Sequence, residues 1–235
     1  INPSYLEAHY SLGNTFQNLN RLDDAIKCYK EVLTIKPDFA EMHNNLGALL
    51  QQHGEIGSAV DHLESALVLK PDFPEAYNNL GNALKDLNQL DKAVRCYEQA
   101  LTIKADYAEA SFNLGNIFQE LKQFDKALIQ YQKTLDIKLD YAEVHNNLGV
   151  TFMELDQLDA SVKCFKKALS FDQDYPEAYY NLASSFLAHG EFDNAIIQYE
   201  KALTLKPKYA EAHNNLGIAF KELGQLDKAV KSYKS

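Results

Sequence analysis

The chain has 235 residues, of which 46% are hydrophobic and 24% are charged, and this composition is typical of folded helical protein. Its formal net charge of -10 argues against a nucleic-acid partner, because contact with a phosphate backbone normally requires a basic stripe, and it favours a neutral or basic protein or peptide. No apolar run of about 18 residues and no charged-then-apolar leader is present, so we expect no spanning helix, signal peptide or membrane partner.

A small residue recurs every 34 residues, which predicts a stack of identical small units without a central core. The recurring residues are Gly13, Gly47, Gly81, Gly115, Gly149, Ala183 and Gly217. They define repeats at 6–39, 40–73, 74–107, 108–141, 142–175, 176–209 and a truncated 210–235, with residues 1–5 assigned to the tail of a preceding repeat. We therefore expect one continuous array over 6–235.

Within a repeat, the apolar residues follow helical spacing twice. They fall at positions 3, 7, 8, 10 or 11 and 14, and again at 17, 20, 21, 24, 27, 28 and 30. Two amphipathic helices joined by a short turn form an αα-hairpin, so the predicted fold class is all-α.

The ends of the predicted helices carry acids and prolines. An aspartate at position 33 precedes a glutamate by three residues and predicts a capping box for the first helix (Asp38, Asp72, Asp106, Asp140, Asp174). An aspartate at position 18 is expected to cap the second helix (Asp23, Asp91, Asp125, Asp159, Asp193, Asp227). Prolines are expected just past the second helix (Pro3, Pro37, Pro71, Pro207).

The glycine at position 8 and the alanine at position 20 are small where two helices must approach closely. We expect the aromatic residue at position 24 to fill the space between neighbouring repeats. Because Ala183 occupies one of the glycine slots, the slot requires small size and not a glycine backbone angle.

These positions together resemble the tetratricopeptide repeat (TPR) family: Leu-Gly at 7 and 8, an aromatic or leucine at 11, Ala at 20 and 27, an aromatic at 24 and Pro at 32. The resemblance covers essentially the whole chain. It implies an α-solenoid that forms a right-handed superhelix, with the first helices on the concave face. Histidine at position 4 and Ala105, Leu139 and Gln173 in place of proline depart from the family pattern.

Neither the histidines nor the cysteines are placed for chemistry. Equivalent histidines lie one or more repeats apart, whereas metal ligands must converge on one ion, so we expect no metal site and no cofactor. Cys28, Cys96 and Cys164 are each two repeats apart, too far for a disulfide, and free thiols favour a reducing, cytoplasmic location. The glutamates at position 2 are interpreted as capping residues, so no catalytic pair is expected.

Asparagine recurs at position 6, beside the Leu-Gly pair of the first helix. The members of this asparagine column are Asn45, Asn79, Asn113, Asn147, Asn181 and Asn215, with Ser11 in the first repeat. A carboxamide offers a donor and an acceptor together, which matches the N–H and C=O of an extended peptide. The column resembles the asparagine ladder in the TPR superhelices of O-linked N-acetylglucosamine transferases, which holds extended peptide.

Variable neighbours of the column are expected to give specificity. The candidates at positions 5 and 9 are Asn44, Asn78, Asn146, Asn214, Asn82 and Asn116, and the candidate aromatic anchors are Tyr10, Phe112 and Tyr180. The alternative is that the asparagines and the aromatic residues only pack neighbouring repeats together.

The sequence thus predicts a non-catalytic scaffold that binds an extended peptide or partner segment on its concave face. Two alternatives stay open: a substrate-recruiting arm of a larger enzyme such as a glycosyltransferase, and a scaffold that self-associates through uncapped array ends.

Overall fold

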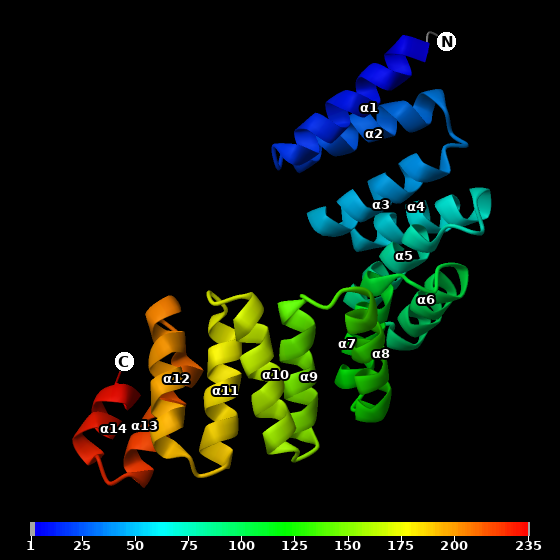
Figure 1. Ribbon diagram of the computed structural model, residues 1–235. Coiled ribbons are helices and arrows are strands. Elements are labelled where there is room, and N and C mark those ends of the chain that lie inside the picture. The colour runs from blue at the N-terminus through cyan, green and yellow to red at the C-terminus, as the bar shows by residue number, and fades with distance from the viewer. Residues whose placement is uncertain (1–2, 235) are drawn as a thin grey trace. The chain divides into compact units, whose positions relative to one another are not determined.

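A computed structural model describes residues 3–234, and the described part of the chain contains fourteen α-helices and no strand. The chain divides into two compact units, residues 1–117 and 118–235. The helices of residues 1–117 are α1 (Pro3–Asn18), α2 (Leu22–Ile35), α3 (Ala40–His53), α4 (Ile56–Leu69), α5 (Pro74–Asp86), α6 (Leu90–Ile103) and most of α7 (Ala108–Glu120). Consecutive helices pair as antiparallel hairpins (Figure 1).

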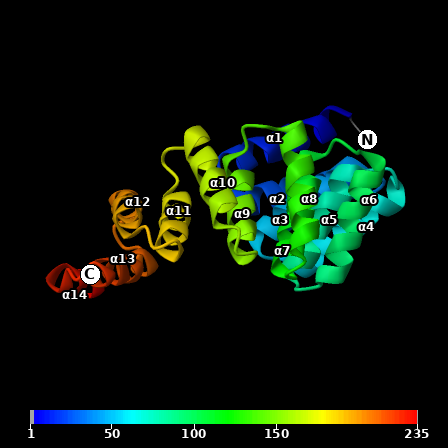
Figure 2. The same cartoon turned by 60° about the horizontal axis from the view of Figure 1, so that its bottom comes forward.

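The second unit repeats this arrangement. Its helices are α8 (Phe124–Ile137), α9 (Ala142–Glu154), α10 (Leu158–Phe171), α11 (Pro176–Ala188), α12 (Phe192–Leu205), α13 (Ala210–Glu222) and α14 (Leu226–Tyr233). Each hairpin packs against the next along the chain, as the turned view of α9 to α14 also shows (Figure 2). The prediction of an all-α solenoid built from helical hairpins is confirmed.

First helices of successive repeats contact one another in the pairs α3–α5, α9–α11 and α11–α13 but, among the described residues, not in the pair α1–α3. Within the described residues, no such contact joins the second helices of successive repeats. Each stack is therefore curved, with its first helices on the inside and its second helices spread apart on the outside. We call these two sides the inner and the outer face.

The turn inside each hairpin uses a left-handed residue at position 15. These residues are Asn20, Gly54, Asn88, Lys122, Asp156, Gly190 and Gly224. The amide of the next residue returns to the carbonyl five residues earlier, as Arg21 does to Phe16 at 2.9 Å, which is the bond of a Schellman motif. Glycine, asparagine and aspartate tolerate this backbone conformation, but Lys122 adopts it at a steric cost.

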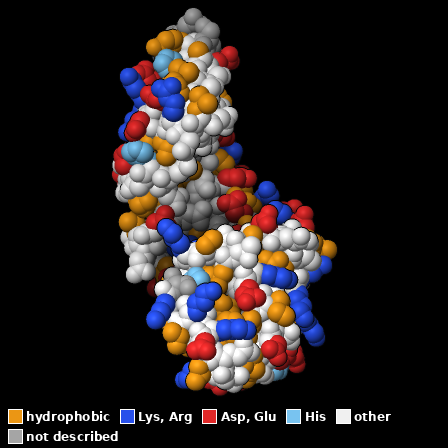
Figure 3. All heavy atoms as spheres, turned by 90° about the vertical axis from the view of Figure 1, so that its left-hand side faces the viewer, with side chains coloured by type: hydrophobic (Ala, Val, Ile, Leu, Met, Phe, Trp, Pro, Cys, Tyr) orange, Lys and Arg blue, Asp and Glu red, His pale blue; other side chains and the backbone are white. Residues whose placement is uncertain are grey.

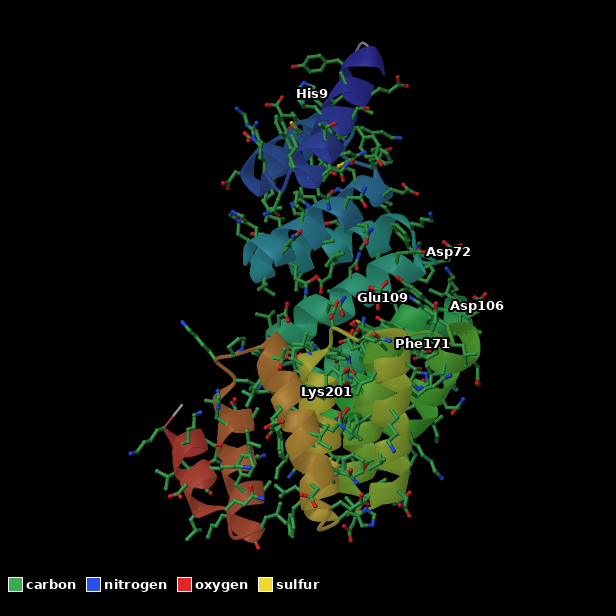
Figure 4. All side chains as sticks on the ribbon, turned by 60° about the vertical axis from the view of Figure 1, so that its left-hand side comes forward. His9, Asp72, Asp106, Glu109, Phe171 and Lys201 are labelled. Atoms are coloured by element: carbon green, nitrogen blue, oxygen red, sulfur yellow. The ribbon has the colours of Figure 1, made fainter. Side chains whose placement is uncertain are left out.

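The predicted side-chain caps are wrong. The N-cap of α3 is Phe39 and that of α5 is Phe73, both without a side-chain cap bond, and the aspartates of position 33 lie in the loops before them, as Asp72 and Asp106 do in Figure 4. The position-18 aspartates lie inside the first turn of the second helix, as Asp91 does in α6. There they favour the helix through its dipole and do not cap it.

One detail at the repeat boundaries also differs from the predictions. Pro37, Pro71 and Pro207 do follow the second helices, but α1 begins at Pro3, so this proline starts a helix. Residues 3–5, which the repeat pattern assigns to the tail of a preceding repeat, lie in the same helix as the start of the first repeat.

The glycine at position 8 lies against the large residue at position 24 of its own hairpin. A Cβ added to Gly81 would lie 2.6 Å from the ring of Tyr97, and one added to Gly149 would lie 2.5 Å from Phe165. The aromatic residue thus fills the space within its hairpin, and it also belongs to an apolar cluster that continues into the next repeat, as Tyr29 does with Met42 and Phe165 with Ala183. None of the described position-8 glycines has a positive φ, so the slot does not require a glycine backbone angle, and the close approach of the position-24 side chain is what limits the size of the residue there.

Candidate functional site

Asparagines of the column donate hydrogen bonds to the position-5 asparagine of the preceding repeat. The Nδ2 group of Asn79 donates to Oδ1 of Asn44 at 2.9 Å, and that of Asn113 donates to Oδ1 of Asn78 at 3.0 Å. In the second unit, Asn181 donates to Asn146 at 2.9 Å. The column residues are half-buried on the first helices, and each of these three carboxamides connects two adjacent first helices.

The position-5 asparagines accept these bonds from beneath the surface. Asn44, Asn78 and Asn146 are 7%, 0% and 5% exposed. Asn44 and Asn146 also donate to the column residue of their own repeat, at 3.4 and 3.3 Å, whereas Asn78 donates to Oε1 of Glu109 at 3.2 Å (Figure 4). Buried carboxamides need such partners, so these three side chains are structural.

The structure therefore supports the interpretation that the asparagines bridge helices, which the sequence left open. It also leaves part of the column available to a ligand. No described residue donates to Oδ1 of Asn79, Asn113 or Asn181, and a carboxamide oxygen has two lone pairs. The column can accept backbone N–H groups from a guest chain through these oxygens while its own N–H groups hold the repeats together.

Polar residues at position 9 form hydrogen bonds with the hydroxyls of the position-24 tyrosines. The hydroxyl of Tyr29 donates to Asn14 at 2.7 Å, and that of Tyr97 donates to Asn82 at 2.6 Å. Ser184 pairs in the same way with Tyr199 at 3.0 Å. Burial raises the pKa of Tyr29 and of Tyr199 to about 12, so both hydroxyls stay protonated and donate.

The sequence carries a signal for this pairing that the 34-residue period by itself does not contain. Where position 24 is Phe165, position 9 is Val150, and where it is Leu63, position 9 is Ala48. A polar residue at position 9 thus accompanies a tyrosine hydroxyl in most repeats, with Ile218 and Tyr233 as the exception. Asn82 is thereby engaged inside its hairpin, and Asn116 also has an interaction partner.

The candidate aromatic anchors pack between helices. Phe112 is 5% exposed, which removes its ring from the surface. The ring of Tyr180 lies 5.8 Å from Tyr199 and 4.9 Å from Tyr209, and its hydroxyl accepts a bond from Asn215 at 3.1 Å. Tyr10 lies 6.5 Å from both Tyr29 and Phe39. All three positions fit the alternative of repeat packing.

Three of the position-2 glutamates, Glu41, Glu75 and Glu177, pair with the lysine that follows the second helix of the same repeat. Lys70 donates to Glu41 at 3.0 Å and Lys206 to Glu177 at 2.9 Å. The bond from Lys70 lowers the pKa of Glu41. The same lysine type lies over the aromatic residue three positions later, as Lys206 does over Tyr209 at 4.4 Å. These glutamates secure the loop between repeats, which replaces their predicted capping role.

Most of the histidines are engaged in local structure. Nε2 of His43, His145 and His213 bonds to the backbone carbonyl six residues earlier, at 3.0, 3.1 and 2.9 Å. His43 also approaches His62, with their Nδ1 atoms 3.0 Å apart. Among the described residues, no group of three or more His, Cys, Asp or Glu side chains could hold a metal ion.

The three cysteines are free thiols. Burial raises the pKa of Cys96 and of Cys164 to about 11, so both stay protonated at neutral pH and are poor nucleophiles. Acidic and basic side chains are interspersed on the face in Figure 3. In the part of the chain that the structure describes, no helix is long and apolar enough to cross a bilayer.

Comparison with known proteins agrees with the repeats found in the structure. A family model described as TPR repeat matches residues 18–54, 52–87, 81–122, 115–156, 151–190 and 183–224. No curated protein sequence matches the chain.

Solved structures share the fold. A tetratricopeptide repeat protein from Parabacteroides merdae is 18% identical, with 98% of this chain and 91% of that chain covered and a TM-score of 0.76. A MamA structure is 28% identical over 72% of this chain and 93% of its own, with a TM-score of 0.63. YrrB, described as a TPR protein with an unusual peptide-binding site, is 21% identical over 78% and 95%, with a TM-score of 0.65.

Proposed function

The chain belongs to the TPR repeat family, and from that premise we propose that it is a non-catalytic scaffold that binds an extended peptide segment along the asparagine column of its inner face. The observation that carries this proposal is the set of Oδ1 atoms on Asn79, Asn113 and Asn181, to which no described residue donates, while their Nδ2 groups are fixed by bonds to the preceding repeat. A fixed row of acceptors recognises a backbone without reading its sequence.

The magnitudes favour weak, additive binding. A net hydrogen bond contributes about 0.5–1.5 kcal/mol, and association costs about 4–15 kcal/mol, so a few column bonds do not hold a peptide alone. Further contacts must come from the guest's side chains. The net charge of -10 favours a neutral or basic guest, and the free thiols favour a cytoplasmic location.

The test starts from a displayed library of random 12-residue peptides selected on the chain. Selected peptides are then resynthesised with single backbone N-methyl groups, which remove an N–H without changing the side chain. We expect N-methylation at the positions that face the column to weaken binding at least tenfold. If every N-methylated peptide binds as tightly as its parent, the column does not accept backbone N–H groups.

Substitutions provide a second arm of this test. Asn113→Ala and Asn181→Ala each remove one acceptor, and the matched control is Asn194→Ala, which changes an exposed asparagine on the second helix α12. Both column variants should weaken peptide binding more than the control does. Urea unfolding of each variant separates lost binding from lost stability, because Asn113 and Asn181 also bridge repeats.

A further inference from the structure

An apolar groove of about 600 Å³ opens on the outer face of the second unit, between α8 and α10 and above α9. These helices lie side by side (Figures 1 and 2). The groove exists because the second helices spread apart on the outside of the curved stack. Leu128, Ile129 and Leu135 of α8 form one wall, and Leu148 and Phe152 of α9 form the floor.

The charged residues that line this groove are both positive. Lys163 and Lys167 of α10 form the opposite wall, and none of the described residues along the groove is acidic. The polar groups at its base are neutral: burial lowers the pKa of His145 and raises that of the Cys164 thiol to about 11. This is unusual in a chain with a net charge of -10.

The sequence explains why this groove is distinct. The two outward positions of the second helix in each repeat are 22 and 25. They are Lys27 and Lys30 for α2, Asp61 and Glu64 for α4, Arg95 and Glu98 for α6, Ile129 and Gln132 for α8, Lys163 and Lys166 for α10, Ile197 and Glu200 for α12, and Lys231 and Lys234 for α14. Only α8 is uncharged at both positions. Ile129 is accordingly 54% exposed, an aliphatic side chain left facing solvent beside the groove.

The equivalent grooves of the same unit differ. Between α10 and α12, Lys166 lies over the ring of Phe186 at 5.5 Å, and Lys201, which is labelled in Figure 4, lies over that of Tyr179 at 5.5 Å. Between α12 and α14, the groove is about 330 Å³ and Glu200 lines it. Most of the residues that line this last groove are equivalent to those of the groove between α8 and α10, with residue numbers higher by 68, or two repeats. It can therefore be used as an internal control.

We propose that the groove between α8 and α10 binds an amphipathic helix of a partner protein, with apolar residues at i, i+3 or i+4 and i+7 in the groove and acidic residues toward Lys163 and Lys167. The groove is open to solvent along its length, so a helix suits it better than an acyl chain does, because a helix covers the groove with its own polar face. This site lies on a different face of α9 from Asn147 and is independent of the asparagine column.

The experiment selects a displayed library of 18-residue peptides on the whole chain and, in parallel, on an Ile129→Asp/Lys163→Glu variant. Both side chains are outside the core, so the variant should keep the wild-type unfolding midpoint. We expect a group of peptides that enrich only on the wild-type chain, that carry apolar residues at helical spacing together with Asp or Glu, and that bind the variant at least tenfold more weakly.

The control variant changes the equivalent groove, as Ile197→Asp/Lys231→Glu, and should bind the same peptides within twofold of the wild type. If no enriched peptide depends on Ile129 and Lys163, or if the dependent peptides carry no acidic residues, the proposal is overturned. A dansylated undecanoate probe tests the other class of ligand. Saturable binding that the Ile129→Asp/Lys163→Glu variant loses, with no groove-dependent peptide, would assign the groove to an anionic amphiphile instead.

Discussion

The hydroxyl of Tyr97 donates a 2.6 Å hydrogen bond to Oδ1 of Asn82, from the second helix of a repeat to its first. The ring beneath this hydroxyl packs on Gly81, where an added Cβ would lie 2.6 Å away. One tyrosine therefore fixes both the spacing and the orientation of the two helices. Phe165 packs on Gly149 in the same way but faces Val150, so it makes no such bond.

A substitution cycle tests this pairing. Tyr97→Phe leaves Asn82 without its donor and should lower the free energy of unfolding by about 0.5–1.5 kcal/mol. Phe165→Tyr places a hydroxyl against Val150 and should also be destabilising, but the double change Phe165→Tyr/Val150→Asn should recover part of the loss. Urea unfolding measures each step, and an additive double variant would show that positions 9 and 24 do not interact.

Asn78 is fully buried and bonds to both Asn113 and Glu109. Asn78→Ala leaves these partners unsatisfied and should lower the free energy of unfolding by about 1–3 kcal/mol. Asn214 occupies the same repeat position but is exposed, so Asn214→Ala should change stability by less than about 0.5 kcal/mol. Equal effects at the two sites would contradict a structural role for the buried carboxamides.

Lys122 has a φ of 56°, in the left-handed region that favours glycine. Lys122→Gly should raise the free energy of unfolding by about 0.5–1 kcal/mol, because glycine adopts this conformation without strain. The reciprocal change, Gly190→Ala at a φ of 76°, should lower it by about 1–2 kcal/mol. Thermal unfolding followed by circular dichroism gives both values, and a destabilised Lys122→Gly variant would show that Lys122 is not strained.

Gly57 and Gly149 provide a second matched pair. A Cβ on Gly57 meets no atom within 4 Å, whereas a Cβ on Gly149 would lie 2.5 Å from the ring of Phe165. Gly57→Ala should therefore stabilise helix α4 by about 0.5–1 kcal/mol, and Gly149→Ala should cost about 1–3 kcal/mol by overpacking. One repeat has Ala183 at the same position and accommodates its methyl group, so the cost of Gly149→Ala should lie toward the lower end of this range. The unfolding midpoints of the two variants should lie on opposite sides of the wild-type value.

His62 gives stability a dependence on pH. Burial lowers its pKa below the ordinary 6.5, and His43 and Lys30 lower it further, against a smaller opposing effect of Asp61. The unfolded chain then binds more protons than the folded chain at pH values below about 6.5. The free energy of unfolding should therefore be highest above pH 6.5, and it should fall as the pH drops through the lower pKa that His62 has in the folded chain.

His62→Cys should reduce this pH dependence. His62 lies at the repeat position that holds Cys28, Cys96 and Cys164 in other repeats, so cysteine fits there, and a thiol carries no charge at acid pH. The pKa of His145 is also lowered, so some dependence should persist in the variant. The measurement is the free energy of unfolding in urea between pH 7.5 and 5. An unchanged slope in His62→Cys would assign the effect to other groups.

The repeats, the all-α class and the small size of the position-8 slot could all be predicted from the sequence, because a 34-residue period and helical apolar spacing are local patterns that packing only reinforces. The caps were predicted wrongly, because Asp38 has the right spacing to Glu41 but the chain turns into α3 at Phe39. The partners of the polar side chains depend on the packing of separate helices, which no local pattern specifies. Asn79 meets Asn44 and Glu41 meets Lys70 because adjacent helices place them together, and the groove above α9 exists because α8 and α10 spread apart.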